Sequence, residues 1–309
     1  MSLPISALTS ITALIFGLFI LSIEAADSAD YWNYYDLFAD RYMVNIGSAQ
    51  ELIDFIWSSR AYYMIMGPAF DVSPLLPYYL GWILLWVGLT AYGFRGLHWL
   101  LFISFFPGPD LMLNVIRQET ALGVVAFLLS VRMPLIAFSA FLLHLSAPLM
   151  VGFVYISGIF EKMFTGLTLR TVLPMIVIIA FGIWLLTSSF FIMALIKLDA
   201  KRGMSTFNAL FIYFVYVQLA ILTVFSLAIR PLPKRLFFFG AALLCLLLTV
   251  LEIYFYRFIY TIYPFIIYEI GEALRIRIRG RKSMISWLNL GGIFGVVAAS
   301  GVLIMRSIL

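Results

Sequence analysis

The sequence predicts an all-α, polytopic integral membrane protein that forms a single membrane domain over residues 1–309. Hydrophobic residues make up 64% of the chain and charged residues 11%, whereas soluble proteins are usually about half apolar. The chain also contains a series of apolar runs, many of about twenty residues, the length that crosses a bilayer as a helix. Together these observations exclude a soluble globular domain.

The apolar runs predict about nine transmembrane helices. They fall at about 4–23, 75–94, 97–108, 111–131, 134–156, 172–196, 207–229, 236–257 and 285–305. We interpret the first run as a retained helix, because it lacks the basic region that opens a signal peptide. The stretch 236–270 is too long for one span, so we expect a kink at Pro264 and an end that lies in the membrane interface.

Charges along the chain predict the orientation of these helices. Segment 24–74 carries eight acidic residues against Arg41 and Arg60, and a scarcity of basic residues is typical of an outer loop. Ser48 and Glu51 have capping-box spacing, which predicts a short helix at about 48–60 on the outer membrane surface. Most later basic clusters then fall on the cytoplasmic side.

One basic cluster breaks this pattern. Residues 230–235 hold three cations, Arg230, Lys234 and Arg235, and the helix count places them outside. Either the count is wrong after residue 207, or these cations serve something anionic on the outer side.

The most informative feature is a set of polar residues inside two of the apolar runs. They are Asn114, Arg117, Gln118, Glu119 and His144. An arginine at a helix centre costs about 2.5 to 3.5 kcal/mol on insertion scales, so it must face protein, water or an anion. Asn114, Arg117 and Gln118 are expected on one helix face because they are three and four residues apart.

Each of these residues has a structural and a functional interpretation. Arg117 either pairs with a carboxylate such as Glu252, or snorkels outward, or aims its planar guanidinium at a phosphate. His144, expected near the middle of its helix, either forms an interhelical hydrogen bond or acts on a substrate oxygen or proton. His98, beside Arg95, is expected to be structural.

An aromatic cluster, D-Y-W-N-Y-Y at 30–35, follows the first apolar run. It fits an aromatic belt at the membrane interface. It also fits a surface on which sugar rings stack while carboxylates bind their hydroxyl groups. Both interpretations remain open from the sequence.

Several function classes have no support in the sequence. Two distant histidines and one cysteine do not form a zinc site, and Cys245 alone forms no intrachain disulfide. The phosphate-binding glycine loop and the nucleophile elbow of hydrolases are both missing. Much of the net charge of +5 lies in a basic stretch at 275–282 that is typical of a cytoplasmic membrane flank, so nucleic acid is not an expected partner.

Four short motifs in order resemble the EpsG family of Wzy-like bacterial polysaccharide and O-antigen polymerases. They are D-Y-W-N-Y-Y after the first span, N-V-I-R-Q-E-T-A at 114–121 followed by Arg132, F-L-L-H-L-S-A at 141–147, and Y-R-F-I-Y-T-I-Y-P at 256–264. The matches are spread over about residues 30 to 264. Their common order is more specific than any single motif.

The resemblance implies a multi-pass enzyme of the bacterial inner membrane that joins oligosaccharide repeat units at the outer face. Donor and acceptor are then oligosaccharides on polyprenyl pyrophosphate, with membrane lipid and a chain-length regulator or flippase of the same pathway as further partners. The resemblance implies no metal and no cofactor. The implied catalytic residues are Arg117, His144 and Asp30, and the implied substrate-binding residues are Gln118, Asn114, Arg257, Tyr31 and Tyr34, with Arg230 or Lys234 as helpers.

Two other functions fit the same residues. One is a non-enzymatic transporter or flippase of an anionic glycolipid. The other is a structural subunit of an envelope polysaccharide assembly, in which the intramembrane polar residues would pair with one another.

Overall fold

The computed structural model describes residues 3–27, 31–40, 47–48, 51–52, 55, 59–105, 107–162, 209–250 and 256–279. Across these ranges the chain is helical and has no strand, which confirms the all-α class. The chain divides into two compact units, one of residues 1–151 and 283–299 and the other of residues 152–282 and 300–309. We call them unit 1 and unit 2.

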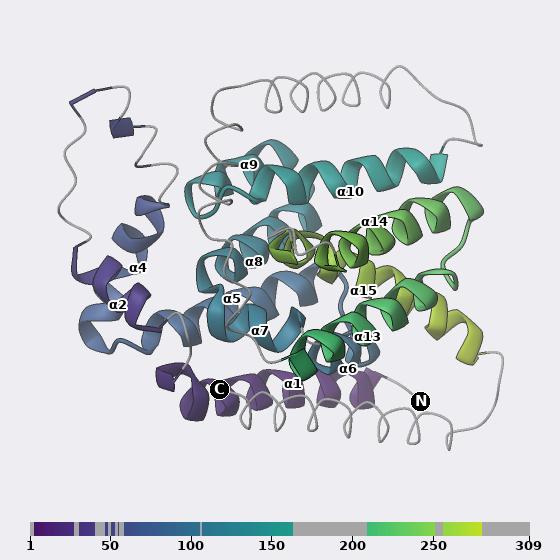
Figure 1. Cartoon of the computed structure of the whole chain (residues 1–309), viewed down its shortest axis with the longest axis horizontal. Helices are drawn as coiled ribbons and strands as arrows, with labels where there is room; N and C mark the ends of the chain where they lie inside the picture. Colours follow the sequence, from purple (N-terminus) through teal and green to yellow (C-terminus); the bar gives the residue numbers. More distant parts are fainter. Residues whose placement is uncertain are drawn as a thin grey trace. The chain divides into compact units, whose positions relative to one another are not determined.

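Unit 1 holds most of the described helices, coloured purple to teal in Figure 1. In chain order they are α1 (Leu3–Glu24), η1 (Ala25–Asp27), α2 (Tyr31–Ala39), α4 (Arg60–Val72), α5 (Leu76–Tyr92), α6 (Gly96–Ser104), α7 (Pro107–Asn114), α8 (Ile116–Ser130), α9 (Pro134–Phe138) and η2 (Ser139–Leu142). The next helix, α10 (Ala147–Lys162), begins in unit 1 and continues into unit 2.

Helices α5 and α8 approach each other closely because glycines lie where their backbones meet. A Cβ atom on Gly88 would lie 1.9 Å from the carbonyl oxygen of Gly123, and one on Gly123 would lie 2.5 Å from that of Leu84. Small residues at such crossings are typical of helix pairs in membranes. This contact holds α8, and with it Arg117, against the rest of unit 1.

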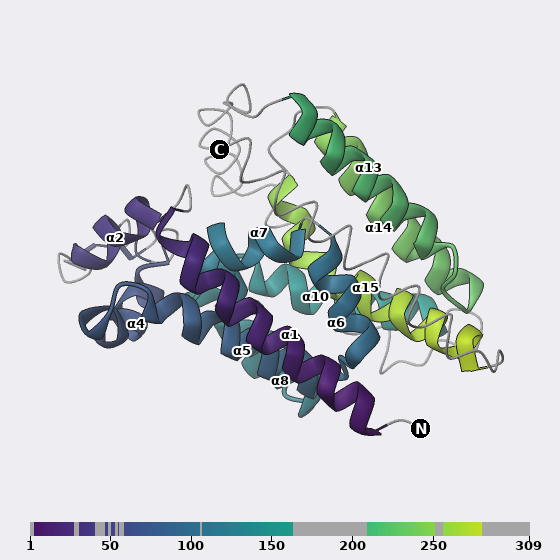
Figure 2. The same cartoon turned by 90° about the horizontal axis from the view of Figure 1, so that it is seen from below.

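Helix α1 packs against α5 and α6 (Figure 2). The indole N–H groups of Trp82 and Trp86 donate to the carbonyl oxygens of Leu14 and Ser10, at 3.0 and 2.8 Å. Other α1 side chains, such as Ile15 and Phe19, are apolar and exposed. Helix α1 therefore carries apolar side chains on its exposed surface as well as where it packs.

Unit 2 contains the rest of α10 together with α13 (Ala209–Ser226), α14 (Leu232–Val250) and α15 (Tyr256–Arg279). Phenylalanines join three of these helices. The ring of Phe153 on α10 lies 4.9 Å from Phe237 and 5.5 Å from Phe238 on α14, and 6.3 Å from Phe265 on α15. Of these rings, Phe238 and Phe265 are buried and add to the apolar core of unit 2.

Several predicted helices are confirmed and three are corrected. Helices α1 and α5 match the runs 4–23 and 75–94 closely. The run 111–131 is not one helix, because the chain breaks at Val115 between α7 and α8. The run 134–156 is also broken, into α9, η2 and α10. The stretch 236–270 is not one helix, because it contains parts of α14 and α15, and Pro264 lies inside the second.

The predicted outer loop at 24–74 is more ordered than a loop, because it contains α2 and α4. The capping box within it is confirmed: the Glu51 N–H donates to the Ser48 hydroxyl at 3.2 Å, and the Gly47 N–H donates to the Glu51 carboxylate at 2.6 Å. These hydrogen bonds lower the pKa of Glu51. Most of the predicted helix at 48–60 lies outside the described residues.

Two predicted spans, 172–196 and 285–305, also lie outside the described residues. Within the ranges that the structure describes, no helix combines the length and the apolarity needed to cross a membrane. The prediction of a polytopic membrane protein stays a prediction.

Candidate functional site

Arg117 lies in the first turn of α8, in contact with two tyrosine rings of unit 1. Its guanidinium carbon lies 5.8 Å from the ring centre of Tyr34 on α2 and 5.5 Å from that of Tyr63 on α4. The guanidinium also donates a hydrogen bond to the Tyr34 side chain. Tyrosine faces attract a cation at such distances. Three elements far apart in the sequence thus meet around one charge.

Phe38 of α2 packs against Tyr63 of α4. Its ring stacks on Phe70 at 4.7 Å and meets the edges of Tyr63 at 4.9 Å. Tyr34 and Phe38 are both buried and lie four residues apart, so they share the inner face of α2. The Y-W-N-Y-Y-D-L-F pattern therefore forms a helix with one buried aromatic face, and that face positions Tyr34 beside Arg117.

Gln118 and Asn114, predicted to share a face with Arg117, lie on two different helices. Gln118 is buried on α8. Asn114 ends α7, on the other side of the break at Val115, and its side chain is not described. The prediction of one continuous helical face is therefore wrong. Val115 has an extended φ of −135°, which ends the helical register between the two residues.

Glu119, also on α8, faces Gly81 of α5. Its side chain is completely buried, and neither carboxyl oxygen has a hydrogen-bond partner within the described part of the chain. A Cβ atom on Gly81 would lie 2.9 Å from one of these oxygens. Such burial is costly, because the carboxyl group loses its hydration without gaining a hydrogen bond from the described residues.

His144 does not lie in the middle of a helix, which corrects the prediction. It lies in the break between η2 and α10, where the Ser146 N–H donates to its Nδ1 at 3.2 Å and the Ser146 hydroxyl lies 2.8 Å from the same atom. Because Nδ1 accepts from a backbone N–H, the neutral ring carries its proton on Nε2. Element η2, just before His144, contacts both α4 and α8, which carry Tyr63 and Arg117.

The aromatic residues of α2 also form an outer row. Trp32 is 67% exposed, and its ring lies 5.2 Å from Tyr31 and 5.7 Å from Tyr35. Tyr31 contacts Tyr78 of α5 at 6.2 Å. Asp30, which precedes this row, lies outside the described residues.

The remaining sequence-predicted cations are in unit 2. Arg257 lies in the first turn of α15, but its side chain is not described, and Glu252 lies outside the described residues. Lys234 on α14 forms ion pairs with Glu269 at 2.8 Å and Glu161 at 3.1 Å. Burial alone would lower the pKa of Lys234, but these two carboxylates raise it overall.

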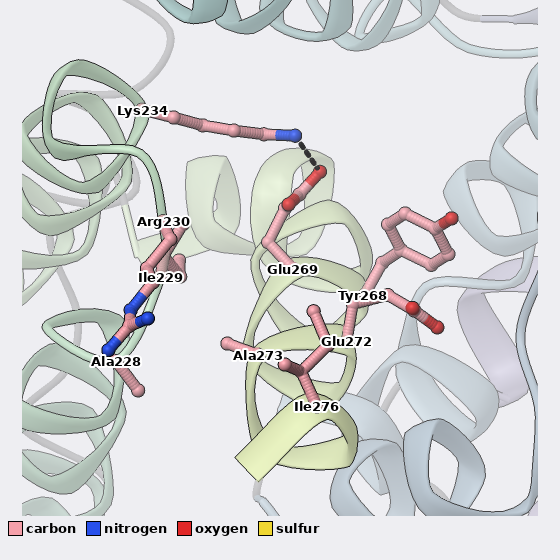
Figure 3. A pocket seen from close by; sticks show the side chains of 9 residues that line it. All are labelled: Ala228, Ile229, Arg230, Lys234, Tyr268, Glu269, Glu272, Ala273 and Ile276. Atoms are coloured by element: carbon pink, nitrogen blue, oxygen red, sulfur yellow. Dashed lines mark ion pairs between the residues drawn. The ribbon is translucent and has the colours of Figure 1, made fainter. Parts of the chain in front are cut away.

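Lys234 and Glu269 line a pocket of about 430 Å³ in unit 2 (Figure 3). Arg230 and Ala228 lie on one side of it, and Ala273 lies opposite on α15. Arg117 and His144 do not line this pocket.

His98 is structural, as predicted: its Nδ1 accepts the N–H of Arg95 at 3.0 Å and caps α6. In the ranges that the structure describes, no group of three His, Cys, Asp or Glu side chains is arranged to hold a metal ion.

Tyr63, Glu161 and Glu269 are site residues that the sequence did not predict. A signal for Tyr63 existed in the Y-Y pair at 62–63, which mirrors the tyrosines at 34–35.

Comparisons of the chain with protein-family models, with curated proteins and with solved structures found no match. The function is therefore argued from the site itself.

Proposed function

We propose that the chain is a membrane glycosyltransferase that polymerises polyprenyl-pyrophosphate-linked oligosaccharide repeat units into exopolysaccharide or O-antigen at the outer face of the bacterial inner membrane. The observation that carries the proposal is Arg117, whose guanidinium lies beside the rings of Tyr34 and Tyr63. A guanidinium suits phosphate oxygens, and phenol hydroxyls add hydrogen-bond donors. The ordered EpsG-like motifs include Arg117, Tyr34 and His144 and give further support.

In the proposed reaction, the hydroxyl oxygen of the acceptor sugar attacks the anomeric carbon of the donor. The bond from that carbon to the pyrophosphate oxygen breaks, and the lipid pyrophosphate leaves with the bonding electrons. Arg117 stabilises the negative charge that develops on the leaving group, which is the largest electrostatic requirement of the step. The acceptor proton passes to a base, for which Asp30 is our candidate.

His144 fits a positioning role better than a basic one. Its Nδ1 already accepts the Ser146 N–H, so Nε2 of the neutral ring is a donor. A donor is suited to a phosphate or sugar oxygen. Gln118, Asn114, Arg257 and the tyrosines Tyr31 and Tyr34 complete the proposed substrate contacts.

The membrane location rests on composition and on apolar exposure. Hydrophobic residues make up 64% of the chain, and apolar side chains such as Leu8 and Ile15 of α1 are exposed. Exposed apolar surface of this kind is stable in lipid and costly in water.

The proposal is tested with purified full-length protein and lipid-linked repeat units, with polymer length as the readout. Arg117→Gln is expected to lower the polymerisation rate by about a hundredfold or more, the loss typical of removing one charge-stabilising group. Arg117→Lys keeps the charge but loses the planar fork, so we expect an intermediate rate. Arg60→Gln removes a cation from the same unit and should leave the rate unchanged.

Polymer of normal length at the normal rate from Arg117→Gln protein that is inserted and folded would refute the proposed role.

The second candidate function is transport of the same kind of anionic glycolipid. Glu119 favours it, because a buried carboxyl without a hydrogen-bond partner in the described chain resembles the proton-carrying groups of membrane transporters. Movement of a labelled lipid-linked sugar across vesicles, without any increase in its length, would support transport over polymerisation.

A further inference from the structure

The pocket of unit 2 lies between two different segments of the chain (Figure 3). Arg230 and Ala228 come from the turn after α13, while Ala273 and Ile276 come from α15. Lys234 reaches across to Glu269 between them. The volume of about 430 Å³ lies within the range of about 300 to 1,000 Å³ usual for small-molecule sites.

The charges of the pocket leave one cation available. Lys234 is paired with Glu269 and Glu161, and Glu272 is paired with Arg275. Arg230 is exposed and has no ion-pair partner among the described residues. The positive charge available to a ligand is therefore the guanidinium of Arg230, a group whose geometry matches a phosphate.

Lys234 can become a second ligand by exchange. Its partner Glu269 is mostly buried, whereas the side chain of Glu161 is 51% exposed. An incoming anion that displaces Glu161 would keep the buried ion pair and gain the Lys234 ammonium. The exposed carboxylate loses little, because ion pairs at the surface contribute little to stability.

Four of the residues that line the pocket are apolar. Ala228, Ile229, Ala273 and Ile276 line it, and Ile276 is 67% exposed. Leu232 and Leu236, at the start of α14 beside Lys234, are also exposed. Apolar walls beside an available guanidinium suit a ligand that carries both an anionic group and an alkyl chain.

We propose that this pocket binds the phosphate group of an anionic lipid, with Arg230 as the first ligand, Lys234 as the second after Glu161 moves away, and the chain of the lipid along Ala273 and Ile276. The site does not require the polymerisation reaction. The same chemistry is offered by a membrane phospholipid and by a lipid-linked sugar phosphate.

The test measures binding of decyl phosphate, below its micelle concentration, to the full-length protein in a neutral detergent. Inorganic phosphate is the control for the anion and decanol the control for the chain. We expect decyl phosphate to bind at least about tenfold more tightly than either, because each supplies only part of the contact. Equal binding of inorganic phosphate would overturn the lipid assignment.

Charge variants test the two cations. Arg230→Gln should weaken binding by about tenfold, the value of one charge-assisted hydrogen bond. Lys162→Gln removes the same charge from an exposed position of unit 2 and should leave binding unchanged. Glu161→Gln should tighten binding, because Lys234 loses a competing carboxylate. Unchanged binding in Arg230→Gln would overturn the proposal.

A variant without charge change tests the cavity. Ala273→Leu fills the wall opposite Arg230 and should weaken binding of decyl phosphate more than that of inorganic phosphate; equal binding to wild type would overturn the proposed place of the chain. If phosphatidylglycerol competes with decyl phosphate and prenyl pyrophosphate does not, the source is membrane lipid. The reverse result assigns the site to the lipid-linked substrate. All of these experiments measure ligand binding to the pocket. Their outcome therefore does not depend on whether the chain polymerises lipid-linked sugars.

Discussion

At the residue scale, the guanidinium of Arg117 contacts two aromatic rings that lie far from it in the sequence. Tyr34 and Tyr63 are 83 and 54 positions away in the sequence, counted from the residue numbers, yet each ring centre lies within 5.8 Å of the guanidinium carbon. An exposed cation over an aromatic face gains about 0.5 to 1 kcal/mol, and a desolvated one about 2. The rings thus help to hold the charge without neutralising it.

The ring of Tyr63 is expected to stabilise Arg117 through its face rather than its hydroxyl. Tyr63→Phe should change the free energy of unfolding little, whereas Tyr63→Leu should lose about 1 kcal/mol of coupling to Arg117. A double-mutant cycle with Arg117→Gln, measured by denaturant unfolding in detergent, gives this coupling. Additive effects of Tyr63→Leu and Arg117→Gln would show that the ring face contributes nothing.

The Lys234 and Glu269 pair predicts how stability depends on pH, and both residues lie outside the apolar runs predicted to cross the membrane. Burial would lower the pKa of Lys234, but Glu269 and Glu161 raise it above its ordinary 10.5. A raised folded-state pKa contributes stability below the unfolded pKa, and this contribution is lost as pH rises through the folded value. The unfolding temperature should therefore fall above pH 10.5.

Glu269 should also make the stability of the protein fall as pH rises, but in the acidic range. Burial raises the pKa of its carboxyl above the ordinary 4.5, although Lys234 opposes the rise. The stabilisation that comes from the protonated carboxyl of Glu269 is fully present below pH 4.5, its ordinary pKa. It is lost as pH rises through the folded-state pKa. Lys234→Met should remove the alkaline dependence and Glu269→Gln the acidic one. A pH profile unaffected by either substitution would contradict these assignments.

At the scale of elements, unit 1 depends on close contact between α5 and α8. This contact explains why Glu119 is fully buried: glycine at position 81 leaves room for its carboxyl group. It also holds α8 in place beside α2 and α4. The site around Arg117 is thus positioned by a helix crossing on the opposite face of α8.

Gly88→Val is expected to destabilise unit 1 by about 3 kcal/mol or more, because its side chain would overlap the backbone of α8. A Cβ atom at position 88 would lie 1.9 Å from the carbonyl oxygen of Gly123. Gly240→Val is the matched control, since nothing lies within 4 Å of a Cβ atom there. Equal free energies of unfolding for the two variants would refute the close crossing.

At the scale of the whole molecule, the proposed orientation can be tested directly by cysteine labelling of intact cells. In a Cys245→Ala background, Asp36→Cys on α2 should react with a membrane-impermeant maleimide, because acidic segment 24–74 is predicted outside. Arg132→Cys should react only after permeabilisation. Both positions are exposed in the folded unit. Labelling of Arg132→Cys in intact cells would reverse or reject the orientation.

Local physical chemistry explains which predictions succeeded. The apolar run of α1 ends near acidic residues, and that of α5 ends before Gly93. The bounds of both helices could therefore be predicted from the sequence. The capping box of Ser48 and Glu51 was also predictable, because its partners are three residues apart. The same holds for His98, which caps its own helix. None of these features requires a distant neighbour.

Hydropathy alone did not reveal the helix breaks. Val115 and His144 lie within continuous apolar stretches, so the mean hydropathy does not mark a helix end at either residue. The break at Val115 separates Asn114 from Arg117, and the break near His144 turns a mid-helix residue into one beside the start of α10. The helices expected around Arg117 and His144 were therefore wrong in their bounds, and the site assigned to these residues stays a prediction.

The sequence by itself determined the all-α class, several helix bounds and the presence of costly polar residues in apolar surroundings, because these depend on composition and short spacing. Only the tertiary structure decided that Tyr63 faces Arg117, that Glu119 faces Gly81, and that Lys234 bridges Glu161 and Glu269. Each such contact joins different helices. Their pairing depends on how helices cross, which is set by packing over the whole unit rather than by any local pattern.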